Sequence, residues 1–158
     1  ADLGIVASMQ PVHVPGDMRT ADRHWGGRSR WAYAFKSLAR SGATLAFGSD
    51  APVETPDPLK GLHAAVIRKD PSSDAQFGWY PEERLTVEET LRAYTTGAAQ
   101  AAGLPASARR STLMPGALAD LAILSEDLFA MPMPDLAGVK VDATMVNGEF
   151  VFERGHAS

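Results

Sequence analysis

Two short apolar segments, separated by a stretch long enough to hold a helix, constrain the fold of this chain most. Residues 3–9 (LGIVASM) and 43–47 (ATLAF) are apolar throughout, and turn residues end each of them, so both are predicted to be buried strands. Residues 31–39 carry apolar side chains at helical spacing, which predicts about three turns of helix between the strands. Strands joined by such a crossover are expected to be parallel, with helices covering the sheet.

Two parallel strands cannot bury both faces of a sheet by themselves. The C-terminal region adds residues 118–124 and a hairpin in which Asn147-Gly148 joins 139–146 to 149–152, too few strands for an independent sandwich. We therefore expect a partial fold. Another copy of the chain could complete the sheet, but the start at Ala1 without a methionine favours a piece of a longer protein.

The other segments also carry local signals. Residues 16–29 are polar and contain glycine, which predicts a loop, whereas 59–67 have the spacing of a helix with His63 on its polar face. Residues 68–84 lack a sustained period and are predicted to form a surface excursion of the kind that often lines a site. A capping-box spacing at Thr86 predicts a helix that continues to about residue 103.

Composition narrows the possible partners and cofactors. Fifteen basic and nineteen acidic side chains give a net charge of −4, which argues against nucleic acid or an anionic membrane as a partner. No apolar run approaches the roughly 20 residues of a membrane helix. The absence of cysteine excludes thiolate ligands and is compatible with the cytoplasm, which is the expected location. Any metal must therefore be held by His, Asp or Glu.

Asp50 is the strongest candidate for chemistry because it follows the second strand. The carboxyl ends of parallel strands are where α/β folds place ligands and catalytic groups, although an aspartate after Gly-Ser is equally typical of a turn or cap. His13 follows the first strand and is expected at the same edge, where a solvated loop residue is the alternative. The histidines show no H-x-H or H-E-x-x-H spacing, so the chain contains no visible closed zinc site.

The aromatic residues are expected in core or cleft packing rather than on a base-stacking platform. Trp25, Trp31, Trp79 and Tyr80 suggest an apolar cleft suited to an aromatic or alkyl substituent of a substrate.

Several segments, in matching order and spacing, resemble the C-terminal part of the amidohydrolase superfamily, and within it amidohydrolase family 3, the YtcJ-like group. The segments that carry the resemblance are 7–13 (ASMQPVH), 47–53 (FGSDAPV), 86–95 (TVEETLRAYT), 113–124 (LMPGALADLAIL) and 144–151 (TMVNGEFV).

The resemblance implies an α/β fold. Residues 1–110 would form the last two βα units of a TIM-like (β/α)8 metal-dependent hydrolase barrel, and 111–158 the C-terminal segment of a composite β-sandwich. In the family an aspartate ending the eighth strand binds the metal and takes the proton of the attacking water, and Asp50 matches that position. Gln10 and His13 match the positions after the seventh strand that face the substrate. The implied cofactor is a divalent metal, expected to be zinc, with most of its ligands outside this chain.

These observations support three hypotheses. The leading one is a C-terminal fragment of a metal-dependent amidohydrolase that hydrolyses a carbon–nitrogen bond in a small non-peptide amide. The fragment is expected to be inactive alone, since it lacks the H-x-H and the other ligands of the family, and to need the remainder of the barrel. The second is a non-catalytic binding or assembly module whose sheet is completed by a partner chain. In the third, several copies associate into a composite barrel.

Overall fold

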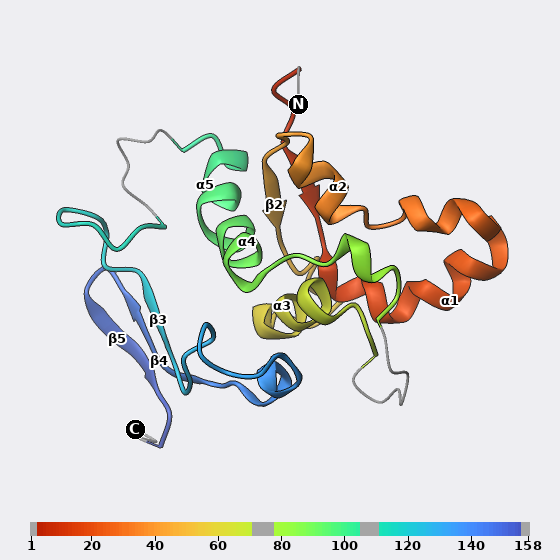
Figure 1. The fold of residues 1–158 in the computed structure, drawn as a ribbon. Coiled ribbons are helices and arrows are strands. Elements are labelled where there is room, and N and C mark those ends of the chain that lie inside the picture. The colour runs from red at the N-terminus through yellow and green to blue at the C-terminus, as the bar shows by residue number, and fades with distance from the viewer. Residues whose placement is uncertain (1–2, 71–77, 105–110, 156–158) are drawn as a thin grey trace.

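The structure is a computed structural model that describes residues 3–70, 78–104 and 111–155. In the first two thirds two short strands stand among helices, and the regular elements afterwards are mainly strands (Figure 1). In chain order they are β1 (Ala7–Met9), a 3-10 turn (Pro11–His13), α1 (Val14–Trp25), a 3-10 segment (Gly26–Trp31), α2 (Phe35–Arg40), β2 (Leu45–Phe47), α3 (Pro58–Ile67), a 3-10 turn (Pro81–Glu83), α4 (Val87–Arg92), a π-helical turn (Ala93–Gly97), α5 (Ala98–Ala101), β3 (Leu121–Leu124), a 3-10 segment (Met133–Gly138), β4 (Val141–Val146) and β5 (Glu149–Glu153).

The predicted parallel pair is confirmed. β1 pairs with β2 in parallel register, with Ala7 opposite Leu45 and Met9 opposite Phe47. Both strands are shorter than expected. The exposed fraction is 84% for Leu3 and 66% for Ile5, because within the described residues β1 has β2 as its sheet neighbour and nothing covers the start of the apolar run.

The first hydrophobic core lies where helices pack on β1 and β2. Phe35 is fully buried and meets Phe47 edge to face, with 5.2 Å between ring centroids. Phe47 meets Tyr94 in the same way at 5.5 Å. This chain of aromatic rings joins α2, β2 and the π-helical turn, so it fixes the strand whose end carries Asp50.

The prediction of a loop over residues 16–29 is wrong. These residues form most of α1 and of the 3-10 segment that follows it. Pro15 in the first turn and Asp17 beside it favour a helix start, and Arg23 and His24 occupy the last turn. The helix forms because Val14 and Ala21 bury one face against the core, a gain that local composition did not reveal.

Other helices differ from expectation in extent. α2 is six residues long rather than about three turns, because residues up to Trp31 belong to the preceding 3-10 segment. α3 confirms the predicted helix over 59–67, but His63 is not on a polar face. It is buried with an exposed fraction of 8%, since α3 is covered on nearly all sides.

The prediction of a surface excursion over 68–84 is wrong at both ends. Arg68 is fully buried and Glu83 is 6% exposed. The backbone NH of Trp79 donates to the Arg68 carbonyl at 2.7 Å, and the Glu83 carboxylate accepts a hydrogen bond from the backbone NH of Ser37 at 2.9 Å. The segment is therefore tied into the fold at these points. Residues 71–77 lie outside the described part of the chain.

The capping box at the predicted helix start is confirmed. The Thr86 hydroxyl accepts from the Glu89 backbone NH at 3.1 Å, and the Glu89 carboxylate accepts from the Thr86 backbone NH at 2.8 Å. Burial raises the pKa of Glu89, but hydrogen bonds from Lys36 and Thr86 outweigh it and lower the pKa below its usual value. The helical path then widens into the π-helical turn, which sequence reasoning missed.

The C-terminal hairpin is confirmed within a three-stranded antiparallel sheet of order β3-β4-β5. Figure 1 shows this sheet apart from β1 and β2, with α4 lying between them. A second core joins α3 to the C-terminal region through Leu62, Val66, Leu128, Leu136 and Val139. The predicted domain boundary at 110/111 coincides with residues 105–110, outside the described residues. None of the helices in the described ranges is long and apolar enough to cross a membrane.

Candidate active site at the carboxyl ends of the parallel strands

The carboxyl ends of β1 and β2 bring together the two residues singled out for chemistry. The Gly48 backbone NH donates to the Met9 carbonyl at 3.2 Å and joins the strand ends. Beyond this bond, His13 Nε2 lies 3.5 Å from Asp50 Oδ2. The two residues are far apart in sequence, and parallel pairing makes them neighbours.

Asp50 occupies an unusual backbone conformation. Its φ is +60°, in the left-handed region, which aspartate tolerates better than most residues but which still costs free energy, roughly 1 kcal/mol. Its carbonyl accepts from the Val53 backbone NH at 2.8 Å, so the chain turns back immediately. The side chain remains 53% exposed. Backbone strain and an exposed carboxylate at a strand end are typical of functional sites.

His13 is held more firmly. Its backbone NH donates to the Gln10 carbonyl at 3.2 Å, and Pro11 and Val14 on either side are buried. The imidazole is 21% exposed, and its Nδ1 lies 3.7 Å from Glu54 Oε1. Sequence reasoning missed Glu54, because a carboxylate in a proline-rich bend carries no local signal. Its meeting with His13 depends on the parallel pairing.

Gln10 lies at the same edge, directly after β1, and is half-buried. Its backbone begins the 3-10 turn that carries His13. The substrate-binding role expected for Gln10 stays a prediction, as do the substrate-binding role of His13 and the metal-binding role of Asp50.

The metal-ligating capacity of this edge is incomplete. Within residues 3–70, 78–104 and 111–155, no three His, Asp or Glu side chains converge as a group that could hold a metal ion. His13 stands between the two neighbouring carboxylates, which approach different nitrogens of its ring. Asp50 can supply one oxygen ligand of the kind divalent metals accept. The described residues therefore fit part of a metal site and not a whole one.

The aromatic residues divide into two roles. Trp79 Nε1 donates to Asp22 at 3.0 Å, and the Tyr80 and Ser29 hydroxyls lie 2.7 Å apart, so these contacts fasten α1 and the following 3-10 segment to the core. Trp25 and Trp31 instead line a hollow of about 590 Å³ that Met9 borders at the end of β1.

Arg68 joins the segments that carry Tyr33 and Trp79 to the first hydrophobic core. Its Nη1 donates to the Tyr33 carbonyl at 2.9 Å and its Nε to the Trp79 carbonyl at 2.8 Å. The guanidinium lies 5.3 Å from the Phe35 ring centroid. Burial lowers the pKa of Arg68 to about 10, and nearby Glu83 opposes that shift. The side chain stays charged at neutral pH and acts as a clamp.

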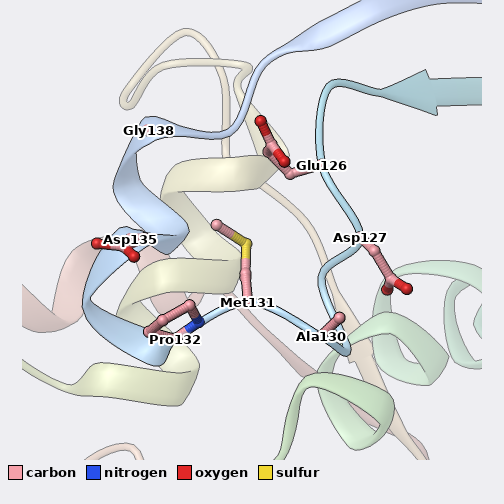
Figure 2. A pocket seen from close by; sticks show the side chains of 7 residues that line it. All are labelled: Glu126, Asp127, Ala130, Met131, Pro132, Asp135 and Gly138. Carbon is pink, nitrogen blue, oxygen red and sulfur yellow. The ribbon is translucent and has the colours of Figure 1, made fainter.

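A hollow of about 500 Å³ in the C-terminal region is a separate feature. Figure 2 shows its acidic side chains Glu126, Asp127 and Asp135 pointing away from one another rather than converging. None of its lining residues comes from the ends of β1 or β2. It is therefore not part of the edge that carries Asp50.

Comparison with known proteins identifies the family of this chain. The sequence profile described as the amidohydrolase family matches residues 1–152. The chain belongs to the amidohydrolase family. Over 157 residues this amidohydrolase chain is 36% identical to YtcJ of Bacillus subtilis (strain 168), a protein described as an amidohydrolase, and the match covers 98% of this chain and 29% of YtcJ.

Two further relatives are a named enzyme and a solved structure. The N-substituted formamide deformylase of Arthrobacter pascens is 28% identical over 122 residues, covering 77% of this chain and 22% of that enzyme. An uncharacterized metal-dependent hydrolase from Pyrococcus horikoshii OT3 has a similar structure, with a TM-score of 0.67 and 28% identity over 84% of this chain and 26% of that one. The chain thus spans less than a third of the length of each of these three relatives.

Proposed function

We propose that this chain carries the catalytic aspartate of a metal-dependent hydrolase that cleaves a carbon–nitrogen bond in a small, non-peptide amide. The observation that carries the proposal is Asp50, exposed and in a strained conformation at the carboxyl end of β2, with His13 beside it at the end of β1. We further propose that β1 and β2 are the last two strands of a TIM-like barrel, whose other strands complete the sheet. The formamide deformylase among the relatives supports the choice of an amide bond.

The residues of this chain have defined roles in the proposed reaction. A divalent metal, expected to be zinc, would lower the pKa of water and polarise the substrate carbonyl. Asp50 would serve as one of the metal ligands, and its carboxylate would accept the proton of the attacking water and pass it to the leaving nitrogen. Gln10 and His13 face the substrate. The isolated chain is expected to be inactive, since the residues that the structure describes supply too few ligands.

The test uses the complete gene product and a set of N-alkyl and N-aryl formamides and acetamides, with release of the amine as the signal. Asp50→Ala should lower kcat on the order of 10³-fold, because the water loses its proton acceptor. Folding should be little changed, since more than half of the side chain is exposed.

Asp135→Asn is the matched control, because Asp135 is an exposed aspartate far along the chain from the strand ends. It should retain full activity. An Asp50→Ala enzyme with normal turnover would refute the catalytic role assigned to Asp50, whereas a parent protein that releases no amine from any of these substrates would favour a non-catalytic module.

A further inference from the structure

The imidazole of His13 is held between two carboxylates that come from a single turn. Asp50 begins the turn in its left-handed conformation, and the hydrogen bond from Val53 to the Asp50 carbonyl returns the chain, so that Glu54 comes back toward the strand edge. Nε2 of His13 then lies 3.5 Å from Asp50 Oδ2, and Nδ1 lies 3.7 Å from Glu54 Oε1. The backbone of Asp50 thereby brings both carboxylates to one ring.

The two contacts together select one orientation of the ring. A half-turn about the Cβ–Cγ bond would place carbon atoms where the two nitrogens now lie and would lose both contacts. The His13 ring is 21% exposed, whereas the side chains of Asp50 and Glu54 are 53% and 40% exposed. Glu54 meets the ring nitrogen that Asp50 does not.

We propose that Glu54 is a positioning residue that orients the His13 imidazole, so that His13 in turn holds Oδ2 of Asp50. This inference rests on the proposed function of Asp50. The contact at Oδ2 fixes the orientation of the Asp50 carboxylate that accepts the proton of the water. Contacts between catalytic groups are commonly long in the absence of substrate and tighten in the reacting complex, which accommodates the 3.5 and 3.7 Å separations.

A purely structural role for Glu54 does not account for this arrangement. An ion pair with a partly exposed carboxylate at such a separation contributes little to stability, about 0–1 kcal/mol. Small errors in the orientation of a catalytic group, in contrast, lower turnover strongly. Loss of Glu54 should therefore affect kcat much more than folding.

The experiment compares Glu54→Ala, Glu54→Asp and the control Glu88→Ala in the complete gene product. Glu88 pairs with Arg92 at 2.8 Å on the exposed side of α4, so its loss removes an ion pair without touching His13. Glu54→Ala should lower kcat at least about tenfold with KM within about twofold, because orientation and not substrate binding is lost. Glu54→Asp should restore part of the rate, and Glu88→Ala should match the parent.

A second measurement reads the His13 ring directly. Long-range ¹H–¹⁵N spectra report both ring nitrogens, and the signals are assigned by their disappearance in His13→Gln. The His13 nitrogen shifts should change in Glu54→Ala and stay the same in Glu88→Ala.

Unchanged His13 signals in Glu54→Ala, or a kcat within about twofold of the parent, would overturn the proposal. The spectra do not depend on turnover, so they separate this inference from the proposed function. If Asp50→Ala remains active, the proposed function fails, and the ring signals still decide whether Glu54 orients His13.

Discussion

Gly97 offers the sharpest test of how closely the π-helical turn packs against β2. A Cβ at this position would lie 2.0 Å from the Leu45 carbonyl oxygen and 3.1 Å from the Leu45 carbonyl carbon. Both atoms are backbone, so no side chain can rotate away. Even a tight 3.0 Å contact requires the π-helical turn or β2 to move by at least 1.0 Å. Gly97→Ala should therefore destabilise the protein.

The expected magnitude follows from two opposing terms. Alanine in place of glycine favours a helix by about 1 kcal/mol, whereas overpacking against an immobile backbone typically costs about 1–3 kcal/mol and occasionally more. Overlap with a main-chain carbonyl belongs at the upper end, so we expect a net loss of about 2 kcal/mol or more. A shift of β2 by this amount would also displace Asp50, and a displacement of about 1 Å at a catalytic group lowers turnover by up to about 100-fold.

The measurement is urea unfolding of the complete gene product, with kcat recorded for the same samples. Gly16→Ala is the matched control, because Gly16 lies in α1 and a Cβ there would meet nothing within 4 Å. That variant should be as stable as the parent or more stable by about 0.5 kcal/mol. If Gly97→Ala and Gly16→Ala unfold at the same urea concentration, the described contact between the π-helical turn and β2 is wrong.

Three further substitutions test other parts of the structure. Arg68→Met should lower the free energy of unfolding by about 3 kcal/mol or more, since buried carbonyls of Tyr33 and Trp79 lose their charged donor; an unchanged urea midpoint would contradict the clamp. Thr86→Ala should cost about 1 kcal/mol through loss of the capping box, and an unaltered unfolding curve would show that the box contributes nothing. Burial lowers the pKa of His63 below its usual value of 6.5, so the unfolded chain binds more protons than the folded one as the pH falls. The stability present above about pH 6.5 is then lost as the pH falls below that value; His63→Leu should flatten this dependence in unfolding curves recorded against pH, whereas equal slopes in both proteins would contradict it.

The parts of the fold that were predictable are those with strong local signals. Asn147-Gly148 between alternating segments predicts the hairpin, because this dipeptide matches the backbone geometry of a tight turn. Thr86 and Glu89 predict a helix start for an equally local reason, the reciprocal hydrogen bonds of a capping box. The apolar segments around β1 and β2 predict a parallel pair, because the connection between them is long enough for a crossover.

The errors concern segments whose state depends on distant contacts. Residues 16–29 have the composition of a loop and nevertheless form α1 and a 3-10 segment, because Val14 and Ala21 reach a core built by other elements. His63 has the sequence pattern of a surface residue but is buried by elements that pack around α3. No local sequence pattern singles out Glu54, and its contact with His13 forms because β1 and β2 pair in parallel.

Local sequence patterns were enough to locate the strands and the hairpin turn, since those states depend on steric preferences and hydrogen bonds within a few residues. It also placed Asp50 and His13 each at the end of a strand. The contact of Glu54 with the second nitrogen of His13 and the burial of Arg68 could be seen only in the folded chain. These outcomes depend on pairing and packing between residues far apart in the chain, whose free energy no local pattern contains.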